Sequence, residues 1–144
     1  MKRLLLIMII ASSGLALQAQ GQSWKVLVDK KVLLEAKAEG SDLRENIINL
    51  SKSKLKKAKL FTIVFEGSGS EWKRRIWLAD SSDQERKSYI MPKADGTIKI
   101  PIADVRKYLQ KDGSLKIWTI MAPPPDVAMR VRLRSFFVCK IIVE

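Results

Sequence analysis

The sequence predicts a mostly β protein, an antiparallel β-sandwich of jelly-roll or immunoglobulin-like topology with one short helix. Beyond residue 21, apolar and polar residues alternate with a period of two through most of the chain, as in half-buried strands. Turn residues divide this pattern into about nine short segments at intervals of about 8 to 12 residues. One stretch, residues 102–110, has apolar residues at helical spacing. This pattern favours a sandwich over a parallel sheet with crossover helices.

The first twenty-one residues have the features of an export signal. Lys2 and Arg3 precede an apolar run, and the small residues Ala19 and Gly21 fit a cleavage site. Residues 12–14 interrupt the run, which is shorter than the ~20 apolar residues that span a bilayer. We therefore expect cleavage rather than permanent anchoring, and no transmembrane segment afterwards.

Removal of residues 1–21 leaves residues 22–144, which we expect to form a single β-sandwich domain in the periplasm or outside the cell. The chain has 27 basic residues, two of them in the signal, so 25 remain against 15 acidic residues and the net charge becomes +10. This charge favours an anionic polysaccharide, an envelope surface or an acidic envelope protein as partner. Export disfavours nucleic acid.

The residue types that the chain lacks exclude several kinds of chemistry. The sequence has no histidine, and Cys139 is its one cysteine. Nucleophile systems that need histidine, zinc sites built from histidine and cysteine, and disulfides within the chain are therefore excluded. We assign no catalytic residue, cofactor or metal. Cys139 lies in an apolar segment, where we expect a small buried hydrophobe rather than an intermolecular disulfide.

The first half of the chain predicts four strands. Residues 24–28 and 31–36 flank a two-residue connection and are expected to form a hairpin. Residues 45–50 return to strand character after a polar loop. A basic connection at residues 51–59 then leads to the clearest strand, residues 60–66, whose apolar residues on both faces predict a central position in a sheet.

The second half adds more strands and the helix. Pro92 and the Asp95-Gly96 pair provide a hairpin turn, and Gly113 ends the helix. Three prolines at residues 123–125 cannot continue a β-ladder. The expected elements are a strand at 72–79, a hairpin of 88–91 and 97–100, the helix at 102–110, and strands at 114–121 and 128–143.

The first candidate binding site lies in the last predicted strand, where Arg130, Arg132 and Arg134 alternate with Val131 and Leu133. In a strand, this alternation places three guanidinium groups on one face and the two apolar residues on the other. Guanidinium groups pair with phosphate, sulfate or carboxylate oxygens two at a time, so the row fits an anionic polymer. A solvated sheet face explains the same pattern, and that alternative stays open.

The second candidate site contains two tryptophans. Trp77 shares strand parity with Lys73 and Arg75, and Trp118 shares it with Lys116, rather than with the core residues. An outward tryptophan offers a flat surface for sugar rings or bases, and a neighbouring cation would hold an acidic substituent. The alternative is that a second sheet or the helix buries these faces, because tryptophan is highly buried on average.

Two further charged clusters have simpler interpretations. The five lysines of residues 52–59 are typical of a solvated connection that keeps a protein soluble. Asp80, Asp83 and Glu85 are expected in a solvated loop, since their spacing does not match a calcium-binding EF-hand and nothing else supports a catalytic carboxylate pair.

Taken together, the sequence predicts an exported, non-catalytic β-sandwich binding module for an anionic or glycan ligand at the cell envelope. The alternative is a structural or assembly protein that docks on another envelope protein. The predicted ligand-binding residues are Lys73, Arg75, Trp77, Trp118, Arg130, Arg132 and Arg134. The predicted core residues are Phe61, Ile63, Phe65, Ile76, Leu78, Ile117, Val131, Leu133 and Ile141.

Overall fold

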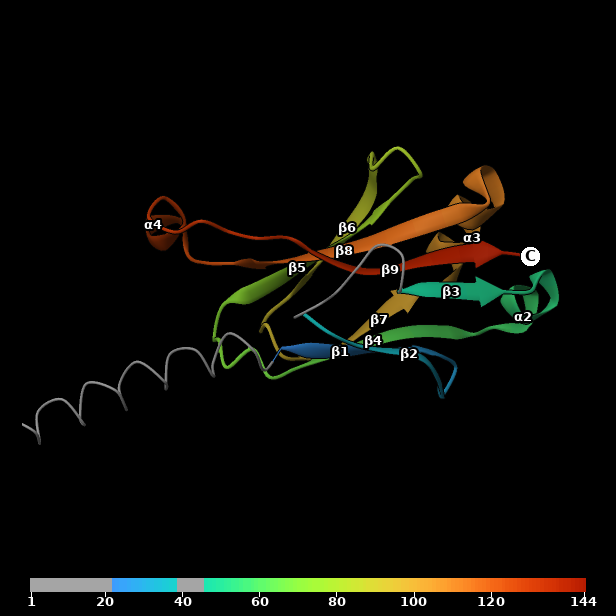
Figure 1. Cartoon of the computed structure of the whole chain (residues 1–144), viewed down its shortest axis with the longest axis horizontal. Helices are drawn as coiled ribbons and strands as arrows, with labels where there is room; N and C mark the ends of the chain where they lie inside the picture. Colours follow the sequence, from blue (N-terminus) through green and yellow to red (C-terminus); the bar gives the residue numbers. More distant parts are fainter. Residues whose placement is uncertain (1–21, 39–45) are drawn as a thin grey trace, which may run out of the picture.

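Two sheets face each other in the computed structural model, which describes residues 22–38 and 46–144 (Figure 1). The four-stranded sheet has the order β2 (Lys31–Lys37), β1 (Ser23–Val28), β4 (Leu60–Glu66) and β7 (Gly96–Pro101). The five-stranded sheet has the order β3 (Ile47–Leu50), β9 (Phe136–Val143), β8 (Ser114–Ala122), β5 (Lys73–Ala79) and β6 (Glu85–Met91). The predicted mostly β class with two antiparallel-rich sheets is confirmed. The predicted signal, residues 1–21, lies outside the described residues.

The predicted hairpin of residues 24–28 and 31–36 is confirmed as β1 and β2. The predicted hairpin of residues 88–91 and 97–100 is wrong, because β6 pairs with β5 and β7 pairs with β4, so the turn between them crosses from one sheet to the other. β1 pairs with β2 and β4, β4 with β7, and β5 with β6 and β8, all antiparallel. β3 instead runs parallel to its neighbour β9, with Ile48 opposite Ile141. A parallel pair needs a long crossover connection, and β3 and β9 are separated by most of the chain.

Three helices occur in the described residues: α2 (Lys52–Lys57), α3 (Ile102–Asp112) and α4 (Pro125–Ala128). The expected helix is confirmed as α3, which ends at Gly113 in the left-handed conformation. The expectation of a single helix is wrong. α2 forms within the lysine-rich connection because Ser51 caps it, accepting a hydrogen bond from the Lys54 amide at 3.3 Å, and because Leu55 is buried.

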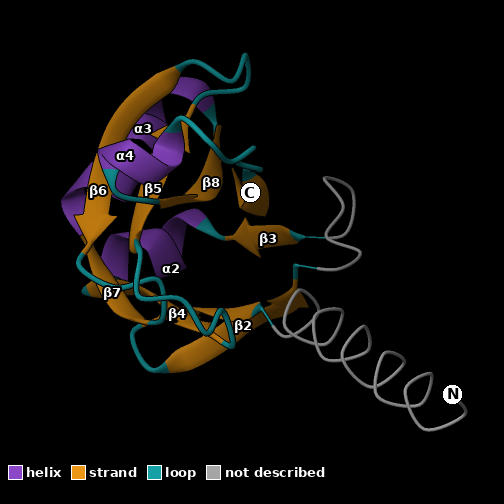
Figure 2. Cartoon of the chain, turned by 90° about the vertical axis from the view of Figure 1, so that its left-hand side faces the viewer, coloured by secondary structure: helices purple, strands orange, loops and turns teal. Residues whose placement is uncertain are grey.

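The helices lie at the ends of the two layers. α4 is at one end of the molecule and α2 at the other, as Figure 1 shows, and the end-on view of Figure 2 shows α2 between the two sheets. Among residues 22–38 and 46–144, none of the helices has the length and apolar content needed to cross a membrane.

The core lies between the two sheets. Trp24 of β1 packs against Phe65 and Phe136, and its indole nitrogen donates to the Val138 carbonyl at 3.2 Å, which ties the two sheets together. Seven of the predicted core residues are at most 1% exposed, which confirms them: Phe61, Ile63, Phe65, Ile76, Leu78, Ile117 and Ile141.

A charged side chain also lies in this core. Arg74 of β5 is fully buried, with its guanidinium 4.2 Å from the centre of the Phe65 ring. It donates to the Ala94 carbonyl at 2.6 Å and to the Thr119 hydroxyl at 3.1 Å. Burial lowers the pKa of Arg74 to about 10, and the charge of Asp95 opposes that shift. The buried charge is therefore held by specific acceptors and an aromatic face.

Candidate functional site

The outer face of the five-stranded sheet carries a row of three aromatic side chains. Trp77 of β5 lies directly opposite Trp118 of β8, with ring centroids 6.4 Å apart and ring planes 11° from parallel. The register shift between Ile117 and Trp118 places Phe137 of β9 opposite Trp118, and the two rings meet edge to face at 5.2 Å. Both tryptophans are half-buried, so part of each indole remains open to a ligand.

Basic side chains flank the aromatic row along the same strands. Arg75 lies opposite Ile120, and its guanidinium is 5.0 Å from the centre of the Trp77 ring. Lys73 is next along the same face, and Lys116 lies on the other side of the row. The structure thus brings together four of the seven predicted site residues: Lys73, Arg75, Trp77 and Trp118.

The cations of this face differ in their partners. Arg75 binds both carboxylate oxygens of Glu85, and Lys116 binds Asp83 at 3.1 Å. In the part of the chain that the structure describes, no carboxylate lies within 4.0 Å of the Lys73 amine. Arg75 is therefore placed to orient the Trp77 ring, whereas Lys73 has its charge available for a ligand.

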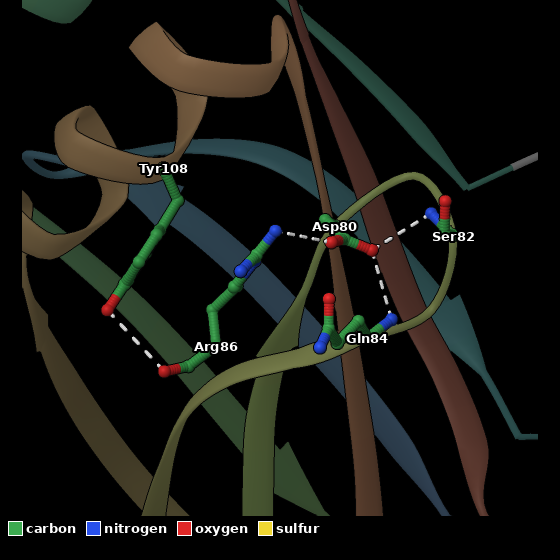
Figure 3. A network of polar contacts seen from close by, with 5 residues as sticks. All are labelled: Asp80, Ser82, Gln84, Arg86 and Tyr108. Atoms are coloured by element: carbon green, nitrogen blue, oxygen red, sulfur yellow. Dashed lines mark hydrogen bonds and ion pairs between the residues drawn. The ribbon is translucent and has the colours of Figure 1, made fainter.

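The acidic cluster expected in a solvated loop shapes the β5–β6 turn. Asp80 is buried and accepts hydrogen bonds from the Ser82 and Gln84 amides at 2.9 and 3.0 Å, while Arg86 approaches its other oxygen at 2.7 Å (Figure 3). The Gln84 amide is the largest cause of the lowered pKa of Asp80. Because Glu85 and Asp83 bind Arg75 and Lys116, this turn also holds the cations beside the aromatic row.

Within residues 22–38 and 46–144, no group of three or more histidine, cysteine, aspartate or glutamate side chains is placed to hold a metal ion. Cys139 is fully buried between the sheets. Burial raises the pKa of its thiol, which keeps the sulfur protonated and unreactive at neutral pH.

The predicted ladder of Arg130, Arg132 and Arg134 is wrong. The chain leaves the sheet after β8, passes through α4 and re-enters at Phe136, so the three arginines lie outside any strand. Val131 and Leu133, predicted to be buried, are 37% and 41% exposed. The arginines do alternate with apolar residues, but no strand within residues 22–38 and 46–144 pairs with this segment. The three prolines lack amide donors and cannot continue the ladder beyond Ala122, where β8 ends.

Residues 129–135, which we call the arm, therefore form an exposed segment at the α4 end of the molecule (Figure 1). Met129 is 92% exposed, and the arm holds half of the large hydrophobic side chains exposed in the described residues. Arg134 lies 5.4 Å from the centre of the Phe136 ring rather than beside the tryptophans. Residues 131–135 make no main-chain hydrogen bond to the described parts of the chain.

Arg74 is the polar residue that the interpretation of the sequence missed. Its strand parity with Ile76 and Leu78 places it on the inner face, and this parity was the available signal. A cation at an inward-facing position normally suggests that the residue lies at the edge of the sheet, because burying an unpaired charge costs free energy. The acceptors that make its burial tolerable come from sequence-distant residues, so the sequence did not reveal them.

Neither a scan against protein-family models nor a search of curated proteins finds a match to this chain. We therefore describe the protein by its own fold, which has two facing sheets with an aromatic row and cations on an outer face. We base the functional proposal on that face.

Proposed function

We propose that this chain is an exported, non-catalytic binding module for an anionic or glycan ligand at the cell envelope. The observation that carries the proposal is the Trp77–Trp118 pair on the outer sheet face, with Lys73 further along the same face. Two nearly parallel indoles on adjacent strands suit the flat faces of sugar rings. The net charge of residues 22–144, with 25 basic against 15 acidic residues, is +10 and favours ligands with acidic substituents.

The residues of the site have different roles in this proposal. Trp77 and Trp118 supply the stacking surface, and Lys73 supplies the charge for an acidic substituent. Arg75 is a positioning residue, because Glu85 neutralises it and its guanidinium packs on Trp77. Residues on rigid strands hold such a surface in place without a cost for ordering a loop on binding.

The test is binding of purified protein to an array of acidic and neutral envelope polysaccharides, with Trp118→Ala compared against Ile120→Ala. Both residues lie on β8 and on the same face, so the control removes a neighbouring apolar side chain and keeps the rings. Stacking on one aromatic ring contributes about 1–3 kcal/mol in nucleic-acid complexes, so Trp118→Ala is expected to weaken binding about tenfold or more. Equal losses in the two variants would contradict the proposal.

The second candidate function, docking on another envelope protein, is favoured by the arm. Its alternating arginine and apolar residues suit a strand, yet residues 131–135 have no main-chain partner among the described residues. β8 also continues past its last pairing with β9, Thr119 with Phe136, so on that side residues 120–122 have no paired strand in the part of the chain that the structure describes. An acidic strand from a partner would satisfy both the backbone groups and the arginines.

Site-specific photocrosslinking tests this candidate. A crosslinker at Val131 is expected to capture one envelope protein, whereas a crosslinker at Lys93, exposed in the β6–β7 connection, captures none. Changing Arg130, Arg132 and Arg134 to glutamine should abolish that product while polysaccharide binding is kept. Equal capture from both positions would remove the docking function, and loss of polysaccharide binding in the triple variant would assign the arginines to the ligand instead.

A further inference from the structure

A cavity of about 520 Å³ lies between the β1–β2 hairpin and α2, at the end of the sandwich opposite α4. Its apolar lining comes from Val28, Leu33 and Leu50, all of which pack on or in the core. Small-molecule sites commonly have volumes of about 300–1,000 Å³ and a mostly apolar lining with a few polar groups. The cavity has the size and lining of such a site, and it is separate from the outer sheet face.

Four lysines surround this apolar lining: Lys30 and Lys31 from the hairpin, and Lys54 and Lys57 from α2. None of them has a carboxylate within 4.0 Å in the part of the chain that the structure describes. Asp29 is the acidic residue of the lining, and its carboxylate accepts hydrogen bonds from the Lys59 and Leu60 amides at 2.9 and 3.1 Å. The cavity therefore has an apolar interior and an excess of unpaired positive charge.

The short helix α2 separates this cavity from a second one. Residues three or four apart share a helix face, so Lys54 and Lys57 line the first cavity while Lys52 and Lys56 line the second. The second cavity also contains Arg106, but its guanidinium donates to the carbonyls of Leu55, Lys56 and Ala58 and fixes the end of α2. The first cavity thus has the larger supply of uncommitted cations.

We propose that the first cavity binds a single-chain anionic amphiphile. The alkyl chain lies along Val28, Leu33 and Leu50, and the phosphate or carboxylate head is held by the lysines of the hairpin and of α2. An inorganic anion would leave the apolar lining in contact with water, and an uncharged apolar molecule would leave the lysines unpaired. A ligand with both parts satisfies the whole lining.

Isothermal titration with decyl phosphate, with decanol and inorganic phosphate as comparators, tests the ligand class. We expect decyl phosphate to bind more tightly than either comparator. Two double variants test the location, since both reverse two charges on the same helix: Lys54→Glu with Lys57→Glu on the first cavity, and Lys52→Glu with Lys56→Glu on the second. Thermal melting followed by circular dichroism confirms that both variants are folded.

The first double variant is expected to weaken decyl phosphate binding about tenfold or more, which corresponds to about 1.4 kcal/mol. The second is expected to change it about threefold or less, because Lys52 and Lys56 line the second cavity and not the first. Leu33→Trp, which fills the first cavity without a change of charge, should also weaken binding. The proposal is overturned if decyl phosphate does not bind, if either comparator binds equally well, or if the second double variant has the larger effect. Unchanged affinity in Leu33→Trp would likewise remove the alkyl chain from this cavity.

Discussion

The contact between Phe65 and Arg74 links the apolar core to its one fully buried cation, and replacing Phe65 by alanine tests both parts. Phe65 is 1% exposed, packs against Trp24 with ring centroids 6.3 Å apart, and lies beneath the Arg74 guanidinium. Truncation of a buried phenylalanine costs about 3–5 kcal/mol. Since a domain of this size has a total stability of about 5–15 kcal/mol, we expect a large shift of the unfolding midpoint.

A double-mutant cycle separates the packing contribution from the cation–π contact. The cycle combines Phe65→Ala with Arg74→Met, and urea unfolding is followed by tryptophan fluorescence. A desolvated cation–π contact contributes about 2 kcal/mol, so the coupling energy is expected to be about 1–2 kcal/mol. Val64→Ala is the matched control, because Val64 is half-buried on the outer face of the same strand and should cost about 1 kcal/mol.

Two outcomes would refute this reasoning. A loss of less than about 1.5 kcal/mol for Phe65→Ala would mean that the ring is not enclosed as the structure has it, because such a loss matches a partly exposed residue. A coupling energy near zero would mean that the guanidinium gains nothing from the ring, and that polar interactions, its hydrogen bonds to Ala94 and Thr119 and the charge of Asp95 among them, hold it in the core.

Four shorter predictions test the N-terminus, the turn, the helix end and the thiol. N-terminal sequencing of exported protein should begin at Gln20 or Gln22, and an intact N-terminal methionine on a cytoplasmic protein would overturn the export prediction. Asp80→Asn should destabilise the fold at pH 7, and the difference from the parent in urea midpoint should shrink as the pH is lowered towards 3. The folded-state pKa of Asp80 lies below its ordinary value of 3.8, so its contribution to stability is present above pH 3.8 and is lost as the pH falls through the folded pKa. Gly113→Ala should cost about 1–2 kcal/mol in thermal unfolding from backbone conformation alone, because φ is +71° and no atom lies within 4 Å of the added Cβ. Cys139 should react with a thiol reagent only at the rate of unfolding, since it is buried, and fast labelling of folded protein would contradict its position.

Local sequence patterns predicted part of the local pairing, although the expected hairpin of residues 88–91 and 97–100 does not form, because β6 and β7 pair with different sheets. The hairpin of β1 and β2 and the buried face of β4 follow from alternation and short connections, and α3 follows from its apolar spacing and from Gly113. α2 was missed because five of its flanking and internal residues are lysines. The single buried residue, Leu55, is too weak a signal for a helix of six residues.

The arm shows why the rest could not be predicted. The alternation of arginine with Val131 and Leu133 is that of a half-buried strand, but a strand also requires a neighbour with free backbone groups. Whether one is present depends on the path of the chain through the three prolines and α4, and on where β8 stops pairing with β9. The parallel pairing of β3 with β9 is of the same kind, since it joins two segments that are far apart in the sequence.

The outer sheet face, the α2 cavity and the arm differ in how many of their cations are paired with carboxylates. On the outer sheet face, Arg75 and Lys116 are neutralised by Glu85 and Asp83. In the described part of the chain, Lys73 is left as the single uncommitted cation among the predicted site residues of this face, so stacking on the tryptophans rather than charge would supply most of the binding free energy. The lysines around the α2 cavity and the arginines of the arm have no such partners among the described residues. Binding at the two ends of the molecule should therefore weaken steeply as salt is added, while binding to the aromatic row should change little, because salt screens exposed charges and leaves apolar contacts intact.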